Sequence, residues 1–266
     1  MGIIYKPRGK AQEYAESAPG KNDGLAINLF SGCRHGCRYC FVPLIPPWKM
    51  MEHGRAKFHE RIRPRKDLLK LLERDCKRRA ESTQPIHLCF TCDPYCSLEN
   101  GKVNPLVREV LLLLETYRMK NVQILTKAIN GASRDFDIIK RNGWMLGSTI
   151  TFIREESRNR WEGRAPSIAD RMLGIQGAHD YGIFTWLSVE PVIYPAEALA
   201  VIEELLPYVD LWKVGKINHG EEIGPDVAKL ERDTDWADFR ERVTQLLDGR
   251  EYLLKKSLLN WEGATS

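Results

Sequence analysis

The sequence predicts one α/β domain in which a parallel sheet curves into a partial (β/α)6-type barrel. Short apolar runs of strand length alternate with longer amphipathic segments along most of the chain, which is typical of repeated strand–helix units. No internal repeat or low-complexity segment interrupts this alternation. A loop with three cysteines follows the first apolar run directly, and ligands in such folds lie at the carboxyl ends of the strands.

The chain before this alternation is polar. Residues 1–24 show little periodicity, and we expect an extended lead-in to a single domain over residues 25–266. Residues 43–64 contain four prolines, which prevent a long helix because proline lacks a backbone N–H. We expect this stretch to be an irregular segment packed onto the domain.

Six or seven strands and six helices are expected in the domain. The strands are expected at 25–30, 86–90, 122–126, 145–152, 184–189, 211–214 and 252–254. The helices are expected at 65–82, 107–117, 136–141, 167–181, 196–209 and 236–247. Ser167 and Asp235 are suited to begin helices, and Asn142-Gly143, Gly182 and Gly249 are suited to end them.

Composition limits the class of protein. The chain has 266 residues, of which 43% are hydrophobic, as a soluble globular core requires. No apolar run is long enough to cross a membrane, and no secretion leader is visible. Seven cysteines in such a chain indicate thiols kept reduced in a cytoplasm rather than disulfides. A net charge of +4 permits a nucleic-acid partner without requiring one.

The cysteine loop carries the strongest signal. Cys33, Cys37 and Cys40 stand at Cys-x3-Cys-x2-Cys spacing, with Gly32 and Gly36 beside them. Three thiolates can hold a 4Fe-4S cluster and leave one iron open for a substrate or cofactor. The alternatives are a zinc site, a redox pair or three unrelated thiols. His35 within the loop is a further candidate zinc ligand.

Polar side chains follow successive strands. Asp93 follows the second strand, Lys127 the third, and Glu190 the fifth, while Ser148 lies in the fourth. A carboxylate could pair with an ammonium group, and a lysine with a carboxylate. Three of these residues have a structural alternative. Lys127 could be a solvated lysine, Ser148 a buried strand hydroxyl, and Glu190 the partner of Lys213. Their shared position favours a cofactor cleft.

The cysteine spacing, with Tyr39 before the third cysteine, resembles the signature of the radical S-adenosylmethionine (SAM) superfamily. Further motifs resemble its spore photoproduct lyase-like branch, often labelled DNA repair photolyase, over roughly residues 4–195. These are Tyr5-Lys6-Pro7-Arg8-Gly9-Lys10, Leu25-Ala26-Ile27-Asn28, Thr91-Cys92-Asp93-Pro94-Tyr95, Leu125-Thr126-Lys127 and Arg164-Ala165-Pro166-Ser167.

The resemblance implies a radical SAM type of barrel and two cofactors, a 4Fe-4S cluster and SAM. In that family the open iron binds SAM, and one electron cleaves it to a 5'-deoxyadenosyl radical that abstracts hydrogen from a substrate. Flavodoxin or ferredoxin would supply the electron. Asp93, Lys127 and Ser148 would contact SAM, with Tyr39 near its adenine, and Glu190 is a further candidate contact. The chain is shorter than the true spore lyase, so only the cofactor chemistry is carried over.

Three more cysteines lie near the second strand. Cys89 or Cys92 lies near the place where a spore lyase has its hydrogen-donor cysteine, and both are candidate catalytic thiols. With Cys96 they also form a Cys-x2-Cys-x3-Cys set, which could hold an auxiliary cluster. The third alternative is inert packing, and it is the one we favour.

Basic residues gather in two places. Arg154, Arg158, Arg160 and Arg164 flank Trp161, and arginine beside an aromatic ring can bind phosphates and stack a base. Arg61, Arg63, Arg65 and Lys66 form another run. The leading hypothesis is a cytoplasmic radical SAM enzyme acting on DNA or a nucleotide-like substrate. The alternatives are a peptide or small metabolite as substrate, or a non-catalytic metal-binding interaction module.

Overall fold

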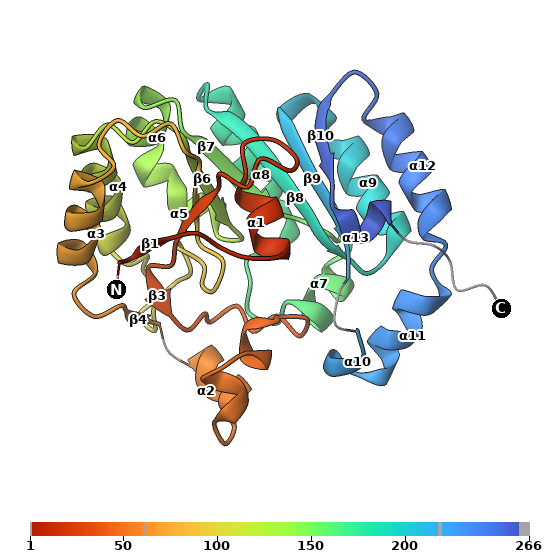
Figure 1. Ribbon diagram of the computed structural model, residues 1–266. Helices are drawn as coiled ribbons and strands as arrows, with labels where there is room; N and C mark the ends of the chain where they lie inside the picture. Colours follow the sequence, from red (N-terminus) through yellow and green to blue (C-terminus); the bar gives the residue numbers. More distant parts are fainter. Residues whose placement is uncertain (1, 61, 218–219, 261–266) are drawn as a thin grey trace.

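The computed structural model describes residues 2–60, 62–217 and 220–260 (Figure 1). Arg61 of the basic run and the last residues of the expected domain, 261–266, lie outside this part. The strands of the described chain are β1 (Ile4–Tyr5), β2 (Leu25–Ile27), β3 (Phe30–Ser31), β4 (Arg63–Pro64), β5 (Ile86–Leu88), β6 (Val122–Thr126), β7 (Met145–Thr149), β8 (Phe184–Val192), β9 (Leu211–Lys216) and β10 (Glu251–Leu254).

The main sheet has the strand order β1-β2-β5-β6-β7-β8-β9-β10. Every neighbouring pair from β2 to β10 is parallel, and only β1 is antiparallel, with Ile4 opposite Ile27. The seven parallel strands are those expected from the apolar runs. The curved sheet does not close on itself, which confirms the predicted partial barrel. A small separate ribbon pairs β3 with β4.

The helices of the described chain are α1 (Lys10–Ala15), α2 (Gly54–Glu60), α3 (Leu68–Lys77), α4 (Leu106–Thr116), α5 (Ile129–Ala132), α6 (Phe136–Arg141), α7 (Glu155–Trp161), α8 (Ile168–Asp180), α9 (Pro195–Leu205), α10 (Gly220–Ile223), α11 (Pro225–Asp233), α12 (Trp236–Leu246) and α13 (Lys256–Leu259). Most of the longer helices connect the strands and cover the convex face of the sheet (Figure 1). Single 3-10 turns occur at Val42–Leu44, Trp48–Met50, Ser133–Asp135 and Leu206–Tyr208.

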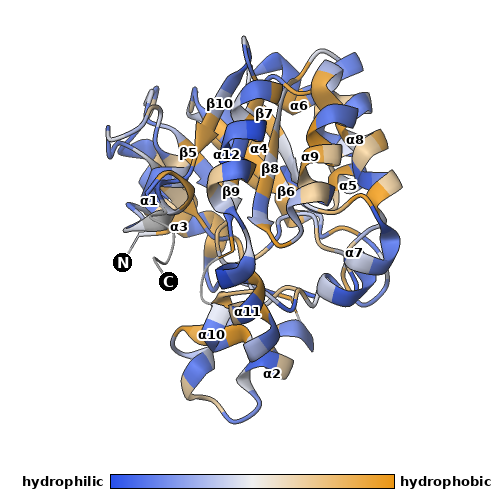
Figure 2. Cartoon of the chain, turned by 90° about the vertical axis from the view of Figure 1, so that its right-hand side faces the viewer, coloured by the Kyte–Doolittle hydropathy of each residue, from blue (hydrophilic) through white to orange (hydrophobic). Residues whose placement is uncertain are grey.

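The core lies between the sheet and these helices. Figure 2 shows apolar residues concentrated on the strands and on the inner faces of the helices, while the outer face of α12 is hydrophilic. Ile124, Leu146 and Leu187 are fully buried on three neighbouring strands, β6, β7 and β8. Strands buried on both faces are near-continuous apolar runs, which is why the sequence predicted them correctly.

The lead-in is not wholly extended as expected. Residues 4–5 form the antiparallel edge strand β1, whose amides at Ile3 and Ile4 donate to Asp75 of α3 at 2.6 and 3.1 Å. Residues 10–15 form α1, which lies across the open side of the barrel in Figure 1. Tyr14 of α1 is buried against the inner face of the sheet, edge-on to His87 and tilted onto Trp186. A helix of six residues has no periodicity long enough to recognise, and its burial stabilises it.

Segments at the carboxyl ends of the strands also contain more helix than expected. The proline-rich stretch includes the short helix α2, and α7 occupies most of the arginine-rich segment that follows β7. Helices α10 and α11 follow β9. Figure 1 shows α2, α7, α10 and α11 gathered at one edge of the barrel. Among the described residues, no helix combines the length and apolarity needed to span a membrane.

Two glycines of α8 offer a matched test of this packing. A Cβ at Gly174 would lie 2.2 Å from Ile129 Cγ2, whereas a Cβ at Gly177 would meet nothing within 4 Å. We expect Gly174→Ala to lower the free energy of unfolding by about 1–3 kcal/mol through overpacking. We expect Gly177→Ala to raise it by roughly 0.5–1 kcal/mol, because alanine favours an exposed helix position. Urea denaturation measures both, and equal effects of the two substitutions would contradict the observed contact of α8 with α5.

Candidate functional site

The cysteine loop follows β3 at the carboxyl edge of β2 and is anchored by backbone hydrogen bonds to distant segments. The Cys33 amide donates to Phe58 O at 3.1 Å, and the Arg38 amide donates to Trp161 O at 2.7 Å. The Arg164 amide donates to His35 O at 2.8 Å. Gly32 and Gly36 have φ of 96° and 69°, a conformation that costs glycine little and other residues more. The loop is therefore held in shape by α2 and by the segment after β7.

The three thiols of the loop lie close enough to influence one another. Burial raises the pKa of Cys37, and the neighbouring thiols of Cys33 and Cys40 raise it further. Burial likewise raises the pKa of Cys40 to about 12, again with a contribution from Cys33. Cysteine thiols lose their protons when a metal binds. Three cysteines of one short loop fit the donor set of a 4Fe-4S cluster, although the ligand atoms that gather around Cys33 among the described residues are those of His35 and Cys96.

Asp93 lies beside this loop and is almost completely enclosed by donors. Its Oδ2 lies 2.8 Å from His35 Nε2 and accepts the Lys127 amide at 2.7 Å. Its Oδ1 accepts from Thr126 Oγ1 at 2.7 Å and from the Tyr95 amide at 2.9 Å. Burial alone would raise the pKa of Asp93, but His35, Thr126 and Lys127 lower it to about 2. Asp93 is therefore an anion whose lone pairs are engaged by the protein.

Tyr39 and Lys127 meet at a second buried carboxylate, that of Glu162. The Tyr39 hydroxyl donates to Glu162 Oε1, and Lys127 Nζ lies 3.6 Å from the same oxygen. Arg171 Nη1 lies 2.5 Å from Glu162 Oε2. Burial alone would raise the pKa of Glu162, but Arg171 and Lys127 lower it. The sequence analysis did not identify Glu162 or Arg171, because a single charged residue in a loop or helix carries no local signal of burial.

The other two candidate SAM contacts lie further along the sheet. Ser148 is fully buried in β7 and donates to Thr126 O at 2.9 Å. Glu190 is partly exposed near the end of β8, close to Lys213 and Tyr14, whose pKa values it influences. Tyr39, Asp93 and Lys127 thus form one contiguous group at the cysteine loop. Ser148 joins that group through Thr126, whereas Glu190 faces the interior beside α1.

The second cysteine set divides in two. Cys89 and Cys92 interact with each other, and Cys92 Sγ accepts the Phe30 amide at 3.4 Å. Cys96 instead lies 3.7 Å from His35 Nδ1. In the described part of the chain, the group of three or more clustered metal-ligating side chains is Cys33, His35 and Cys96, and it includes none of Cys37, Cys40, Cys89 and Cys92. This arrangement gives no support to an auxiliary cluster on Cys89, Cys92 and Cys96.

The interpretation of Trp161 as a base-stacking residue is wrong. Trp161 is fully buried, and its indole N–H donates to Tyr194 Oη at 3.1 Å. Several of its arginine neighbours are engaged internally as well. Arg158 pairs with Glu155 at 2.8 Å, and Arg164 donates to His59 O at 2.7 Å. The segment therefore supports the cysteine loop, because α7 turns the indole into the core rather than toward solvent.

Comparison with known structures identifies the class of fold. No protein-family model matches the sequence, and no curated protein matches it either. Solved structures do match: the chain has the partial-barrel fold of radical SAM enzymes, as the sequence predicted.

Two proteins with this fold are spore photoproduct lyase and SuiB of Streptococcus suis. A spore photoproduct lyase variant matches with a TM-score of 0.63 at 14% identity, over 90% of this chain and 78% of the lyase. Another variant of it was solved with bound AdoMet and dinucleoside spore photoproduct, with a TM-score of 0.60 at 14% identity and the same coverage. SuiB bound to S-adenosylmethionine matches with a TM-score of 0.60 at 14% identity, over 86% of this chain. The chain spans about half the length of SuiB, 49%.

Glu162 provides a test of the buried charge group. Glu162→Gln leaves the Arg171 guanidinium, which is 1% exposed, without its anionic partner. Removing one member of a buried pair costs about 3–5 kcal/mol, and we expect a loss of this size in urea denaturation of the metal-free, reduced chain. The matched control is Glu156→Gln, an exposed position on α7, the helix that Glu162 directly follows, where a change within about 0.5 kcal/mol is expected. Equal stability of the two variants would show that Glu162 does not hold the site together.

Proposed function

We propose that this chain is a radical SAM enzyme that holds a 4Fe-4S cluster with Cys33, Cys37 and Cys40. The observation that carries the proposal is the position of these three cysteines in one loop that is anchored at the carboxyl edge of the sheet. The fold shared with spore photoproduct lyase and SuiB supports it. When bound, the cluster supplies one electron for cleavage of SAM to a radical that abstracts hydrogen from the substrate.

We propose that SAM lies above the strand ends, against Tyr39, Lys127 and Glu190, which are all partly exposed. Asp93 and Ser148 belong to the same proposal, but both are buried and hydrogen-bonded within the protein. Direct contact of either with SAM requires exchange of one of those hydrogen bonds. Their role without such exchange is to fix the cysteine loop and the backbone of Thr126 and Lys127.

The test of the proposal is cluster assembly followed by SAM cleavage. Anaerobic reconstitution should give about four irons per chain, and with SAM and a reductant the protein should release 5'-deoxyadenosine. We expect Cys37→Ala to lose both the iron and the product. The control is Cys76→Ala, a buried thiol of α3 outside the loop, which should keep both. Iron and SAM cleavage that persist in Cys37→Ala would refute the proposal.

We also propose that Cys92 donates hydrogen to a product radical. Cys92 is partly exposed, whereas its neighbour Cys89 is buried, so Cys92 has the better access to a substrate. Cys89 is then a supporting thiol, since the two interact directly. A Cys92→Ala enzyme that still cleaves SAM but forms little substrate product would support this assignment.

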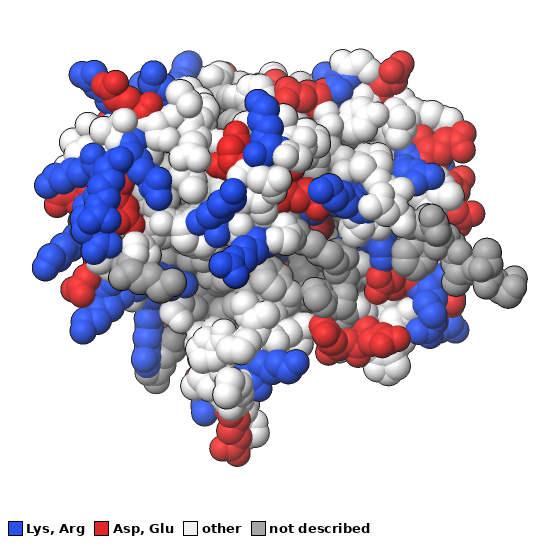
Figure 3. Space-filling view, in the orientation of Figure 1, with Lys and Arg blue, Asp and Glu red and all other residues white. Residues whose placement is uncertain are grey.

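The proposed substrate is a nucleic acid. Arg63, Arg65, Lys66 and Lys70 are exposed around β4 and the start of α3, beside the strand that pairs with β3 ahead of the cysteine loop. Figure 3 shows Lys and Arg side chains gathered on the side of the molecule where α3 lies. A peptide substrate is the second candidate, because SuiB, solved with its precursor peptide SuiA, shares the fold. We further propose a cytoplasmic location and flavodoxin or ferredoxin as the electron donor.

Salt dependence distinguishes the two substrates. If the basic surface binds phosphates, affinity for a single-stranded DNA oligomer should fall steeply with salt through counterion release. Replacing Arg63, Arg65 and Lys66 with Ala should reduce the logarithmic salt slope by about 2, at roughly 0.7 per phosphate contact. The control triple is Lys229→Ala, Arg242→Ala and Arg250→Ala, which are exposed cations at the other end of the chain. Binding that is absent at low salt, or equally affected by both triples, would favour the peptide.

A further inference from the structure

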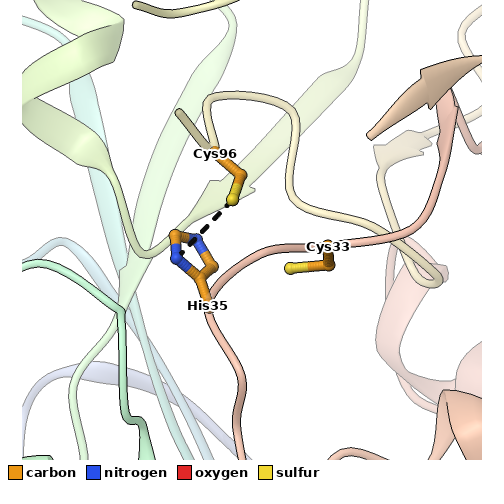
Figure 4. A group of neighbouring side chains, drawn as sticks. All are labelled: Cys33, His35 and Cys96. Atoms are coloured by element: carbon orange, nitrogen blue, oxygen red, sulfur yellow. Dashed lines mark hydrogen bonds between the residues drawn. The ribbon is translucent and has the colours of Figure 1, made fainter. Parts of the chain in front are cut away.

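Cys33, His35 and Cys96 form a group that the three-cysteine motif does not account for. Figure 4 shows the three side chains approaching one another from two loops, the cysteine loop and the loop that follows β5. One donor atom from each lies within 4.8 Å of the other two. His35 is 4% exposed and Cys96 is 3% exposed, so both are turned away from solvent and toward Cys33.

The orientation of His35 is that of a metal ligand. Its Nε2 lies 2.8 Å from Asp93 Oδ2, and its Nδ1 lies 3.7 Å from Cys96 Sγ. A histidine that binds a metal through one ring nitrogen usually donates the other N–H to a carboxylate. Asp93 is itself fixed by Thr126, Tyr95 and the Lys127 amide. The ring is therefore held with Nδ1 facing the Cys96 thiol, and the Cys33 thiol lies in the same group.

The spacing of the donors matches a tetrahedral ion. With Zn–N near 2.0–2.1 Å and Zn–S near 2.3 Å, neighbouring N and S ligands are about 3.6 Å apart, and two S ligands about 3.8 Å apart. The observed 3.7 Å between His35 Nδ1 and Cys96 Sγ lies at this value. The third donor, Cys33 Sγ, is within 4.8 Å of both, which is at most about 1 Å more than the separation of two S ligands on zinc.

We propose that Cys33, His35 and Cys96 bind one Zn²⁺ ion, with Asp93 orienting the histidine and water in the fourth position. Binding releases the two thiol protons to the solvent. Cys33 belongs both to this site and to the proposed cluster site, so the two metals exclude each other. The loop thus has two metal-bound states, and zinc occupancy prevents assembly of the cluster.

Metal titration of the reduced, metal-free chain tests this site without any activity measurement. The wild type should bind one Zn²⁺ per chain, and Co²⁺ in its place should give the intense near-ultraviolet absorption of thiolate-to-cobalt charge transfer. Cys96→Ala and His35→Ala should each weaken zinc binding by more than about a hundredfold, and Asp93→Asn by about 10- to 100-fold. Circular dichroism checks that each variant is folded, and Cys96→Ser replaces Cys96→Ala if the latter is not.

The matched controls are Cys37→Ala and Cys40→Ala, which remove thiols of the same loop but not of the zinc site. Both should keep wild-type zinc affinity although both should lose the iron. Loss of zinc binding in these two variants, or unchanged affinity in Cys96→Ala and His35→Ala, would overturn the proposal.

A competition experiment separates this inference from the proposed function. Zinc added before iron and sulfide should block cluster assembly in the wild type but not in Cys96→Ala. Equal blocking in both would overturn the exclusive use of Cys33. If no variant assembles a cluster under any condition, the proposed function fails, and the zinc titrations alone still decide the present inference.

Discussion

The site depends most on the buried carboxylate of Asp93. An isolated anion in a protein interior is strongly unfavourable, so it persists only where donors surround it. Here four donors come from three separate segments: His35 from the cysteine loop, Tyr95 from the loop after β5, and Thr126 with Lys127 from the end of β6. Displacing any one segment would remove at least one of these four donors from the buried charge. The loop is thus positioned by electrostatics as well as by its backbone contacts.

Glu162 is a second buried carboxylate that positions the cysteine loop. It holds Tyr39, which lies between Cys37 and Cys40, and it balances Arg171 from α8. Lys127 connects the two carboxylates, since its amide donates to Asp93 and its ammonium group lies beside Glu162. One residue at the end of β6 therefore relates the position of His35 to that of Tyr39. Substitutions at Asp93 and at Glu162 should therefore have non-additive effects on stability, because the two residues belong to one coupled network.

The sequence predicted features that depend on local patterns, and it did not predict contacts between residues that are distant in the chain. Parallel strands buried on both faces are apolar runs, so β6, β7 and β8 were predicted close to their observed bounds. The cysteine motif is local, and its loop was predicted too. Glu162 is 123 positions from Tyr39, and Asp93 is 58 positions from His35. The partner of a buried charge is set by the folded topology, and no local pattern of the chain encodes it. The burial of Trp161 is likewise set by the folded topology and not by the local sequence.

The lead-in shows how an incompletely closed barrel is completed. The sheet ends at β1 on one side and β10 on the other, and α1 lies across the gap (Figure 1). Lys213 Nζ of β9 donates to Tyr14 O at 2.8 Å and to Gln123 Oε1 of β6 at 3.1 Å, while the Lys256 amide after β10 donates to Glu13. Burial and the nearby Lys255 lower the pKa of Lys213 to about 7.

Because a helix closes this side in place of further strands, a groove remains along it. Its volume is about 870 Å³, and it is lined in part by Lys6, Arg8, Lys216 and Lys256. Lys216 ends β9, and no residue of the cysteine loop is among those that line the groove. Helix α1 contributes Gln12 and Glu13 to the lining. Helix α1 therefore both packs against the inner face of the sheet and forms part of one wall of this groove.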